Sequence, residues 1–374
     1  MGRLQRGSRC RQSDERPDNQ GRHSGSMSRP AQTDRASIVV VQDRTQRVVV
    51  TPVRFGLFVP QGWIMDLAEI EDPIEQYETM SRVAQTAERL GFESIWLFDH
   101  FHTYFKPVLE TTFECWTSTA ALARDTKTIR LGQMVTCNSY RNPALMAKMA
   151  STVDVLSHGR LDFGIGAGWY EHEYLAYGYA YPPTAGERLR ILAEALQVIR
   201  AMWAAPHASF EGEFYKISGA INEPKGVQKP HPPIWVGGSG EKVTLRLAAQ
   251  YGDATNFGGH LDDMSWYAHK LEVIRAHCED FGRDPDELIR STNVETTLLR
   301  AGDDPEELTK RYRRDQTLAE YRTHAVVGGP QEVIDTYGRL IDAGMNYIVV
   351  ADLPGIATTD ILEYLGSEVL PAFR

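Results

Sequence analysis

The chain has 374 residues, of which 42% are hydrophobic, and a formal net charge of −10 at pH 7. Residues 1–50 hold ten arginines and five acidic residues, so the rest carries −15, and nucleic acid is not expected as the main partner. No apolar run approaches the roughly 18 residues that span a membrane, and the four cysteines form no C-x-x-C pair, so we expect a soluble, cytoplasmic protein without zinc or disulfides.

Residues 1–52 are predicted to be a disordered N-terminal extension. Residues 1–35 lack a hydrophobic stretch, any periodicity and the apolar core of a secretion signal. We interpret them as a dispensable tail or as the result of a start codon ahead of Met27, with an RNA- or membrane-binding arm as the alternative. SIVVV and RVVVT, within residues 37–51, are candidates for strands or a small hairpin over a barrel end.

From residue 53 onward, strand-like and helix-like segments alternate with short connections. The apolar segment 53–59 is followed by a helix over 73–91, which has apolar residues at three- and four-residue spacing and stops at Gly91. Further strands are expected over residues 94–98, 128–136, 160–168, 233–238, 253–259, 288–299 and 346–352. Further helices are expected over residues 112–126, 142–157, 187–203, 242–251, 264–282, 330–344 and 358–370, and a hairpin over 208–218.

This order of elements predicts the fold class. Strictly alternating strands and helices with right-handed crossovers give a parallel sheet, and eight units over residues 53–374 indicate an α/β protein with a (β/α)8 TIM barrel carrying insertions. The alternative is a doubly wound open sheet. It is disfavoured because no G-x-G-x-x-G follows the first strand.

The active site of a TIM barrel lies at the carboxyl ends of its strands, so the residues at these ends are the candidate site residues. Asp99 and His100 directly follow the apolar run SIWLF. The other strand ends are Pro60–Trp63, Thr136–Asn138, Gly166–Trp169, Gly237–Gly240, Asn256–Gly259, Glu295–Thr296 and Ala351–Asp352. Three of these ends are rich in glycine, which lets a backbone approach a ligand closely, so a large flat or phosphorylated ligand is expected.

Two glycine-rich ends predict particular contacts. GGSGEKVTLRLAA opens directly into a helix, whose free amides would bind a phosphate, with a plain tight turn as the alternative. The residues concerned are Gly237, Gly238, Ser239 and Gly240. At the end of the fourth strand, a wall against a ring system is predicted from Gly166, Ala167, Gly168, Trp169 and Tyr170.

The end of the third strand offers polar groups of a different kind. Thr136 and Asn138 can donate hydrogen bonds to a ligand edge, whereas Cys137 is interpreted as a small buried residue and not as a nucleophile. Asn142 and Pro143 are interpreted as the cap and first turn of the next helix.

A metal site is the competing interpretation of DHFH, because His100 and His102 after a strand resemble the paired ligands of a metal-dependent amidohydrolase, and Asp352 matches one further ligand position. Such a site would also need ligands from strands four to six, where the sequence has glycine instead. No metal is therefore predicted. A simpler alternative is that Asp99 only caps the next segment.

The chain from about residue 53 to its end resembles the bacterial-luciferase-like monooxygenase superfamily, and within it the branch that uses the deazaflavin coenzyme F420. Four motifs carry the resemblance in the order and spacing of that branch: DHFH, VTCNSYRNPALMAKMASTVDVLSHGR, GIGAGWYEHEYLAYGY and IWVGGSGEKVTLRLAA. The resemblance implies that His100 lies beside the reactive carbon of the deazaflavin and acts as acid or base during hydride transfer, a role that fits histidine chemistry.

The resemblance also implies a set of coenzyme contacts. A bulge at Gln133–Thr136, often with a non-proline cis peptide, would lie against the ring. The implied contacts are Asp99, His100, Met134, Val135, Thr136, Asn138, Gly166, Ala167, Gly168, Trp169, His172, Gly237, Gly238, Ser239 and Gly240.

The sequence departs from the sugar-phosphate dehydrogenases of the branch at two positions. Those enzymes have Trp where this sequence has Tyr104 and Glu where it has Trp169, and both residues serve their substrate chemistry. His100 and Tyr104 are the predicted catalytic residues. Glucose 6-phosphate is not expected, and the aromatic residues near the strand ends favour a small, neutral, apolar substrate. The predicted function is an F420-dependent oxidoreductase, by resemblance a homodimer; the alternatives are an FMN-dependent luciferase-like monooxygenase and a non-catalytic coenzyme-binding barrel.

Overall fold

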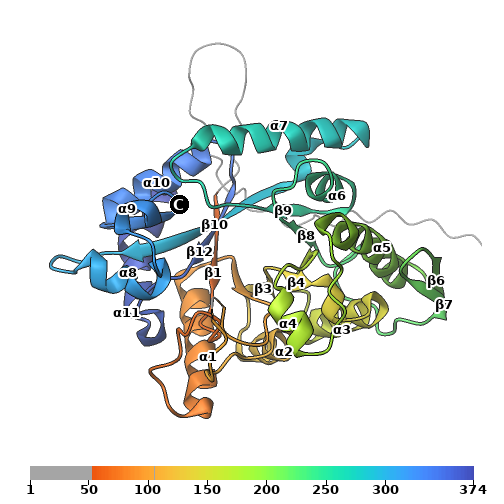
Figure 1. Ribbon diagram of the computed structural model, residues 1–374, viewed down its shortest axis with the longest axis horizontal. Helices are drawn as coiled ribbons and strands as arrows, with labels where there is room; N and C mark the ends of the chain where they lie inside the picture. The colour runs from red at the N-terminus through yellow and green to blue at the C-terminus, as the bar shows by residue number, and fades with distance from the viewer. Residues whose placement is uncertain (1–52, 105) are drawn as a thin grey trace, which may run out of the picture. The chain divides into compact units, whose positions relative to one another are not determined.

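Eight parallel strands pair into a closed ring in the computed structural model, which describes residues 53–104 and 106–374 (Figure 1). In ring order the strands are β1 (Arg54–Phe58), β2 (Ser94–Leu97), β3 (Arg130–Gln133), β5 (Leu161–Gly166), β8 (Ile234–Gly237), β9 (Ala254–Asn256), β10 (Ile289–Leu298) and β12 (Tyr347–Ala351). The ring closes because β12 pairs with β1. All eight strands lie within segments predicted from the sequence, so the TIM barrel is confirmed and the open sheet is wrong.

An outer layer of helices covers the barrel. The helices are α1 (Pro73–Leu90), α2 (Cys115–Asp125), α3 (Pro143–Leu156), α4 (Glu171–Ala176), α5 (Ala185–Ala204), α6 (Thr244–Tyr251), α7 (Met264–Asp280), α8 (Pro305–Arg313), α9 (Leu318–Tyr321), α10 (Pro330–Asp342) and α11 (Asp360–Glu368). Figure 1 shows α1, α2, α3, α5, α6, α7 and α10 following one another around the strands. Gly91 ends α1, and the Asn142 side chain caps α3 by accepting from the Ala144 amide, both as predicted.

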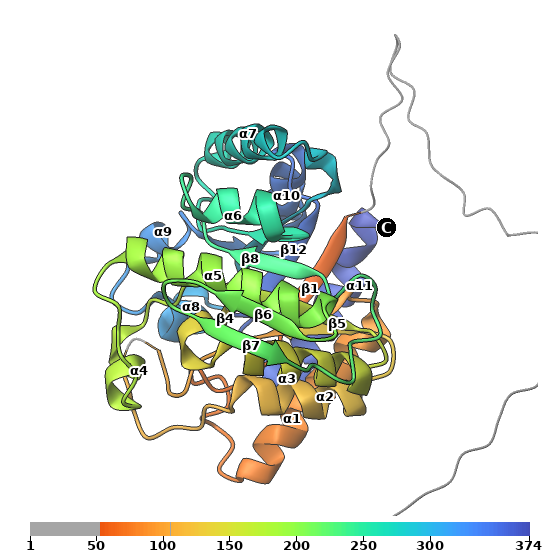
Figure 2. The same cartoon turned by 90° about the vertical axis from the view of Figure 1, so that its right-hand side faces the viewer.

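Two insertions interrupt the repeat. The first holds α4 and the antiparallel hairpin β6 (Ala208–Glu211) and β7 (Lys216–Ala220), which lies beside α5 and confirms the predicted hairpin (Figure 2). The second follows β10 and holds α8, α9 and the strand β11 (Ala325–Gly328). The sequence interpretation placed no element between 299 and 330. Elements as short as α9 and β11, each of four residues, are too brief to show a periodicity.

Large side chains fill the barrel interior. The rings of Trp96 on β2 and Trp235 on β8 lie 4.6 Å apart between centroids although these strands are not neighbours, so both side chains point into the barrel. Trp235 also packs on Tyr347, at 5.1 Å. Because the interior is occupied, a ligand site has to lie at the mouth formed by the strand ends.

The predicted disorder of residues 1–52 and the candidate hairpin within 37–51 lie outside the described residues. Within residues 53–104 and 106–374, no helix combines the length and apolarity needed to cross a membrane.

Candidate active site

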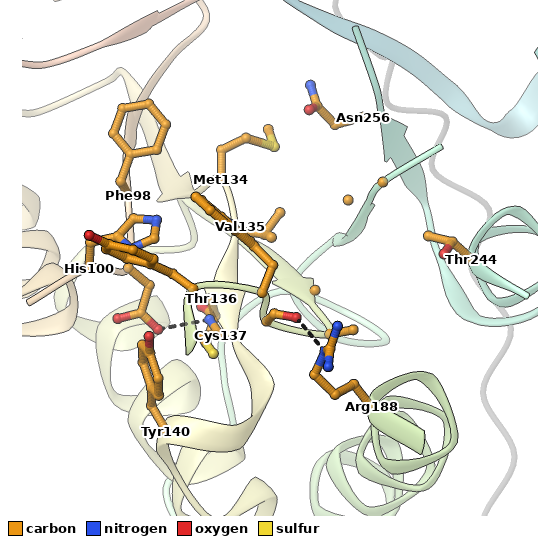
Figure 3. A pocket seen from close by; sticks show the side chains of 18 of the residues that line it. Phe98, His100, Met134, Val135, Thr136, Cys137, Tyr140, Arg188, Thr244 and Asn256 are labelled. Carbon is orange, nitrogen blue, oxygen red and sulfur yellow. Dashed lines mark hydrogen bonds between the residues drawn. The ribbon is translucent and has the colours of Figure 1, made fainter. Parts of the chain in front are cut away.

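A cavity of about 450 Å³ opens at the carboxyl ends of the strands. In Figure 3, His100 and Phe98 lie on one side and Thr244 and Arg188 on the other, with Met134 and Val135 between them. The predicted site residues that line it are Asp99, His100, Met134, Val135, Thr136, Gly166, Ala167, Gly168, Trp169, Gly237 and Gly238. Residues from four different strand ends are therefore brought to one place.

Five predicted site residues do not line this cavity. Tyr104 lines a second, adjoining cavity. Asn138 is buried with its side-chain nitrogen 3.4 Å from the Tyr215 hydroxyl, and the His172 Nδ1 lies 3.1 Å from the Nε2 of His102. Ser239 and Gly240 lie in the loop before α6. Roles for these residues in coenzyme binding stay predictions.

His100 is held in place by a carboxylate that the sequence interpretation did not select. Its Nδ1 lies 2.8 Å from Glu173 Oε2, and its ring stacks on the indole of Trp63 at 4.5 Å with an interplanar angle of 7°. His100 is 9% exposed and lines the cavity. The contact with Glu173 engages one ring nitrogen and leaves Nε2 for a ligand.

Glu173, on α4, has no exposed surface and gathers four donors. Oε1 accepts from the backbone amides of Phe101 (2.7 Å) and His102 (3.3 Å), while Oε2 faces His100 and accepts from the Tyr140 hydroxyl at 2.6 Å. Burial alone would raise the pKa of Glu173, but the hydrogen bonds from His100, Tyr140 and the Phe101 amide outweigh burial and lower it. Glu173 is therefore an ionised acceptor. It lies 73 residues from His100, and no local spacing signals the pairing.

Asp99 joins strand ends to one another. Its two carboxylate oxygens accept from Arg141 at 2.7 and 3.0 Å, and Oδ2 also accepts from the Cys137 amide at 2.9 Å. Burial raises the pKa of Asp99, although Arg141 opposes the shift. The carboxylate is thus engaged by the protein's own groups, although Asp99 also lines the cavity.

The end of β3 bulges into the cavity, as the family resemblance implies. The peptide bond between Met134 and Val135 is cis. The Val135 side chain packs against Gly166 and Gly237, where an added Cβ would lie only 2.6 and 2.7 Å from its methyl groups. These glycines are therefore required by the close approach of Val135, in addition to lining the cavity.

The far side of the cavity differs from the sequence prediction in one respect. The glycine-rich stretch does not open directly into a helix, because residues 241–243 form a turn and α6 begins at Thr244, which lines the cavity. Arg188, on α5, also lines it and donates to the carbonyl oxygens of Gly168 (3.1 Å) and Pro182 (2.8 Å). Arg188 was missed, although a basic residue near the start of a predicted helix was visible in the sequence.

The two histidines of DHFH contact different partners and do not converge on one point. His100 faces Glu173, and His102 faces His172. In the part of the chain that the structure describes, no group of three or more His, Cys, Asp or Glu side chains could hold a metal ion.

Comparison with known families assigns the barrel to a family. The profile of the family described as "Luciferase-like monooxygenase" matches residues 53–347. The chain belongs to the luciferase-like monooxygenase family.

Curated relatives include enzymes with different coenzymes. An uncharacterized protein of Mycobacterium tuberculosis is 32% identical over 190 residues, 47% of this chain and 66% of that protein, just under two thirds of its length. An F420-dependent glucose-6-phosphate dehydrogenase of Amycolatopsis mediterranei is 26% identical over 325 residues, 78% of this chain and 93% of the relative. The oxygenase component of a flavin-dependent trigonelline monooxygenase of Acinetobacter baylyi is 32% identical over 185 residues, 49% of this chain and 48% of the relative.

Among solved structures, an F420-dependent secondary alcohol dehydrogenase in complex with an F420-acetone adduct superposes with a TM-score of 0.73. The superposition covers 87% of this chain and 100% of the dehydrogenase at 20% sequence identity. At that identity, the match supports the barrel fold alone.

Proposed function

We propose that this protein is an F420-dependent oxidoreductase that moves a hydride between the deazaflavin and a small substrate with an apolar body. The observation that carries the proposal is the His100–Glu173 pair at the edge of the cavity. A hydride that moves to or from a carbonyl has to be matched by a proton, and His100 is placed to carry it.

The cavity fits a deazaflavin in several respects. The Thr136 hydroxyl is buried and has no hydrogen-bond partner within the described residues, so it is available to the edge of a ring system. The Val135 bulge offers an apolar surface for the face of the ring. On the far side, Gly238 and Arg188 would hold the anionic tail. When bound, the coenzyme would supply or accept the hydride.

His100 would hold the proton at Nε2. Because ionised Glu173 can only accept hydrogen bonds, Nδ1 carries the ring's first proton, and neutral His100 presents Nε2 as an acceptor. In substrate oxidation, Nε2 takes the alcohol proton while the hydride leaves carbon. In reduction, protonated His100 returns that proton to the carbonyl oxygen. The tautomer of His100 set by Glu173 and the stacking of its ring on Trp63 favour an acid–base role, and they argue against a non-catalytic coenzyme-binding barrel.

An FMN-dependent monooxygenase is the second candidate. The family description and the similarity to the oxygenase component of a flavin-dependent monooxygenase favour it. The F420-dependent relative covers more of the chain, 78% against 49%, and this coverage together with the match of DHFH to the deazaflavin branch supports F420.

Coenzyme titration separates the two candidates. We expect the protein to bind F420 at least about ten times more tightly than FMN, measured side by side through quenching of tryptophan fluorescence. Thr136→Val should weaken the binding of F420 more than Thr152→Val, an exposed helical position away from the cavity. Equal affinities, or tighter binding of FMN, would contradict the proposal.

We also propose that the protein is a homodimer, as the family resemblance implies, and that it is cytoplasmic, as its scattered cysteines suggest. Sedimentation velocity of the purified protein measures its oligomeric state, and fractionation of the source cells measures its location. A monomer at micromolar concentration would contradict the first point.

A further inference from the structure

A second cavity of about 270 Å³ adjoins the first and shares Trp63, Phe98 and Asn293 with it. Tyr104, the second predicted catalytic residue, lines this second cavity. Trp63 connects the two cavities, because its ring stacks on His100 at 4.5 Å and on Tyr104 at 4.9 Å. A substrate whose reacting carbon lies beside His100 can therefore place the rest of its atoms in the second cavity.

The polar part of the second cavity holds two carboxylates. Glu295 on β10 pairs in register with Ala351, the last residue of β12, and Asp352 directly follows it. Asp352 also contributes to the lining. Arg314 and His324 also line the cavity.

The resident cations do not fully compensate these carboxylates. Burial raises the pKa of Asp352 well above its ordinary value, and the neighbouring Glu295 and Asp66 add to the shift. Burial raises the pKa of Glu295 as well, although His324 and Arg314 both lower it. A cation placed between the two carboxylates would favour their ionised forms, which burial disfavours, so the cation and the carboxylates that line the cavity would stabilise one another.

The apolar part of the second cavity is aromatic. Phe58, Phe98, Trp63 and Tyr104 line it, and the Phe58 and Phe98 rings stack at 4.1 Å. Aromatic faces attract cations through their quadrupole. The Arg314 guanidinium, 4.7 Å over the Tyr104 ring, already uses one such face.

We infer that the second cavity binds a substrate whose apolar body carries a cationic nitrogen, with the nitrogen directed to Glu295 and Asp352 and the body packed against the aromatic side chains of the lining. The inference rests on the proposed function for the position of the reacting carbon beside His100. It adds a charge to the neutral apolar substrate that the sequence favours.

The test compares two probes of the same shape in the protein without coenzyme. Choline carries the quaternary nitrogen, and 3,3-dimethylbutan-1-ol replaces that nitrogen with carbon. We expect calorimetry at pH 7.5 to show at least about tenfold tighter binding of choline. Equal affinities, or tighter binding of the alcohol, would overturn the inference.

Variants locate the bound charge. Asp352→Asn and Glu295→Gln should each weaken choline binding by about tenfold or more and change the affinity for the neutral alcohol by less than threefold. Glu279→Gln, an exposed residue on α7, is the matched control and should bind choline as the wild type does. If Asp352→Asn does not fold, Glu295→Gln carries the same test. Unchanged choline binding in a folded Glu295→Gln variant would refute the assignment, whereas F420 titration separately tests the proposed function.

Discussion

Replacing Glu173 by glutamine tests whether this carboxylate sets the protonation of His100. The introduced side chain has the same shape but carries one accepting oxygen and one donating NH2 group. The backbone amides of Phe101 and His102, which contact Oε1 at 2.7 and 3.3 Å, can only donate, so the new oxygen should face them. The NH2 group then faces His100, which has to accept at Nδ1 and carry its proton at Nε2.

The size of the effect follows from that change of tautomer. An Nε2 that already carries a proton cannot take one from an alcohol, so we expect oxidation to slow by roughly 10²–10⁴, the range for the loss of a general base. The aspartate-to-asparagine change in a Ser-His-Asp triad, which imposes the wrong tautomer, costs about 10⁴. Coenzyme affinity should change by less than about threefold because Glu173 does not line the cavity.

The assay follows a single turnover of F420 reduction by absorbance, with a secondary alcohol first identified from a panel. The ¹⁵N chemical shifts of His100 report its tautomer independently of activity. Tyr140→Phe is the control, because it removes a different donor from the same Oε2 and leaves the His100 contact in place. If Glu173→Gln turns over within threefold of the wild type and keeps the tautomer, the carboxylate does not position His100.

Three further outcomes are expected. His100→Ala should leave F420 affinity within a few-fold and slow hydride transfer by roughly 10²–10⁴, and stopped-flow rates near those of the wild type would disprove its acid–base role. Gly166→Ala places a Cβ 2.6 Å from a methyl group of Val135 and should cost about 1–3 kcal/mol in urea unfolding. Adding Val135→Ala should restore most of that loss if the contact is the cause. Burial raises the pKa of Asp66 to about 6, so the folded state keeps a proton that the unfolded state releases near pH 4. The free energy of unfolding should therefore fall by about 1–3 kcal/mol as pH rises from 4 to 6, and a wild-type slope equal to that of Asp66→Asn would contradict this.

The barrel could be predicted from the sequence because its strands are buried on both faces. Such strands, for example β2 and β5, appear as short apolar runs between helices with clear periodicity. Within the insertion after β10, α9 and β11 could not be predicted, because four residues cover only about one helical turn or two strand periods and are too few to show a reliable pattern.

Some residues of the candidate site could likewise be predicted from the sequence and others could not. His100 follows a strand directly, so its place at the mouth could be inferred from chain order alone. Glu173 could not be found, because its pairing depends on the path of the chain between β5 and α5 and leaves no spacing signal. Gly166 and Gly237 were expected to allow the close approach of a ligand, which stays a prediction; the group that the structure shows close to both of them is the Val135 side chain of the protein itself.

Different parts of strand β10 pair with different strands. Its first residues pair with β9, its middle pairs with β12, and its last residues, Glu295–Leu298, pair with β11. The pairing that closes the barrel therefore uses the first two thirds of β10, and the insertion over residues 299–328 follows the end of the strand and pairs only with its last residues. Substitutions in α8 and α9 can reshape the wall around Arg314 without altering the register of closure. The wall of the second cavity can thus vary in sequence while the residues that line the first cavity stay the same.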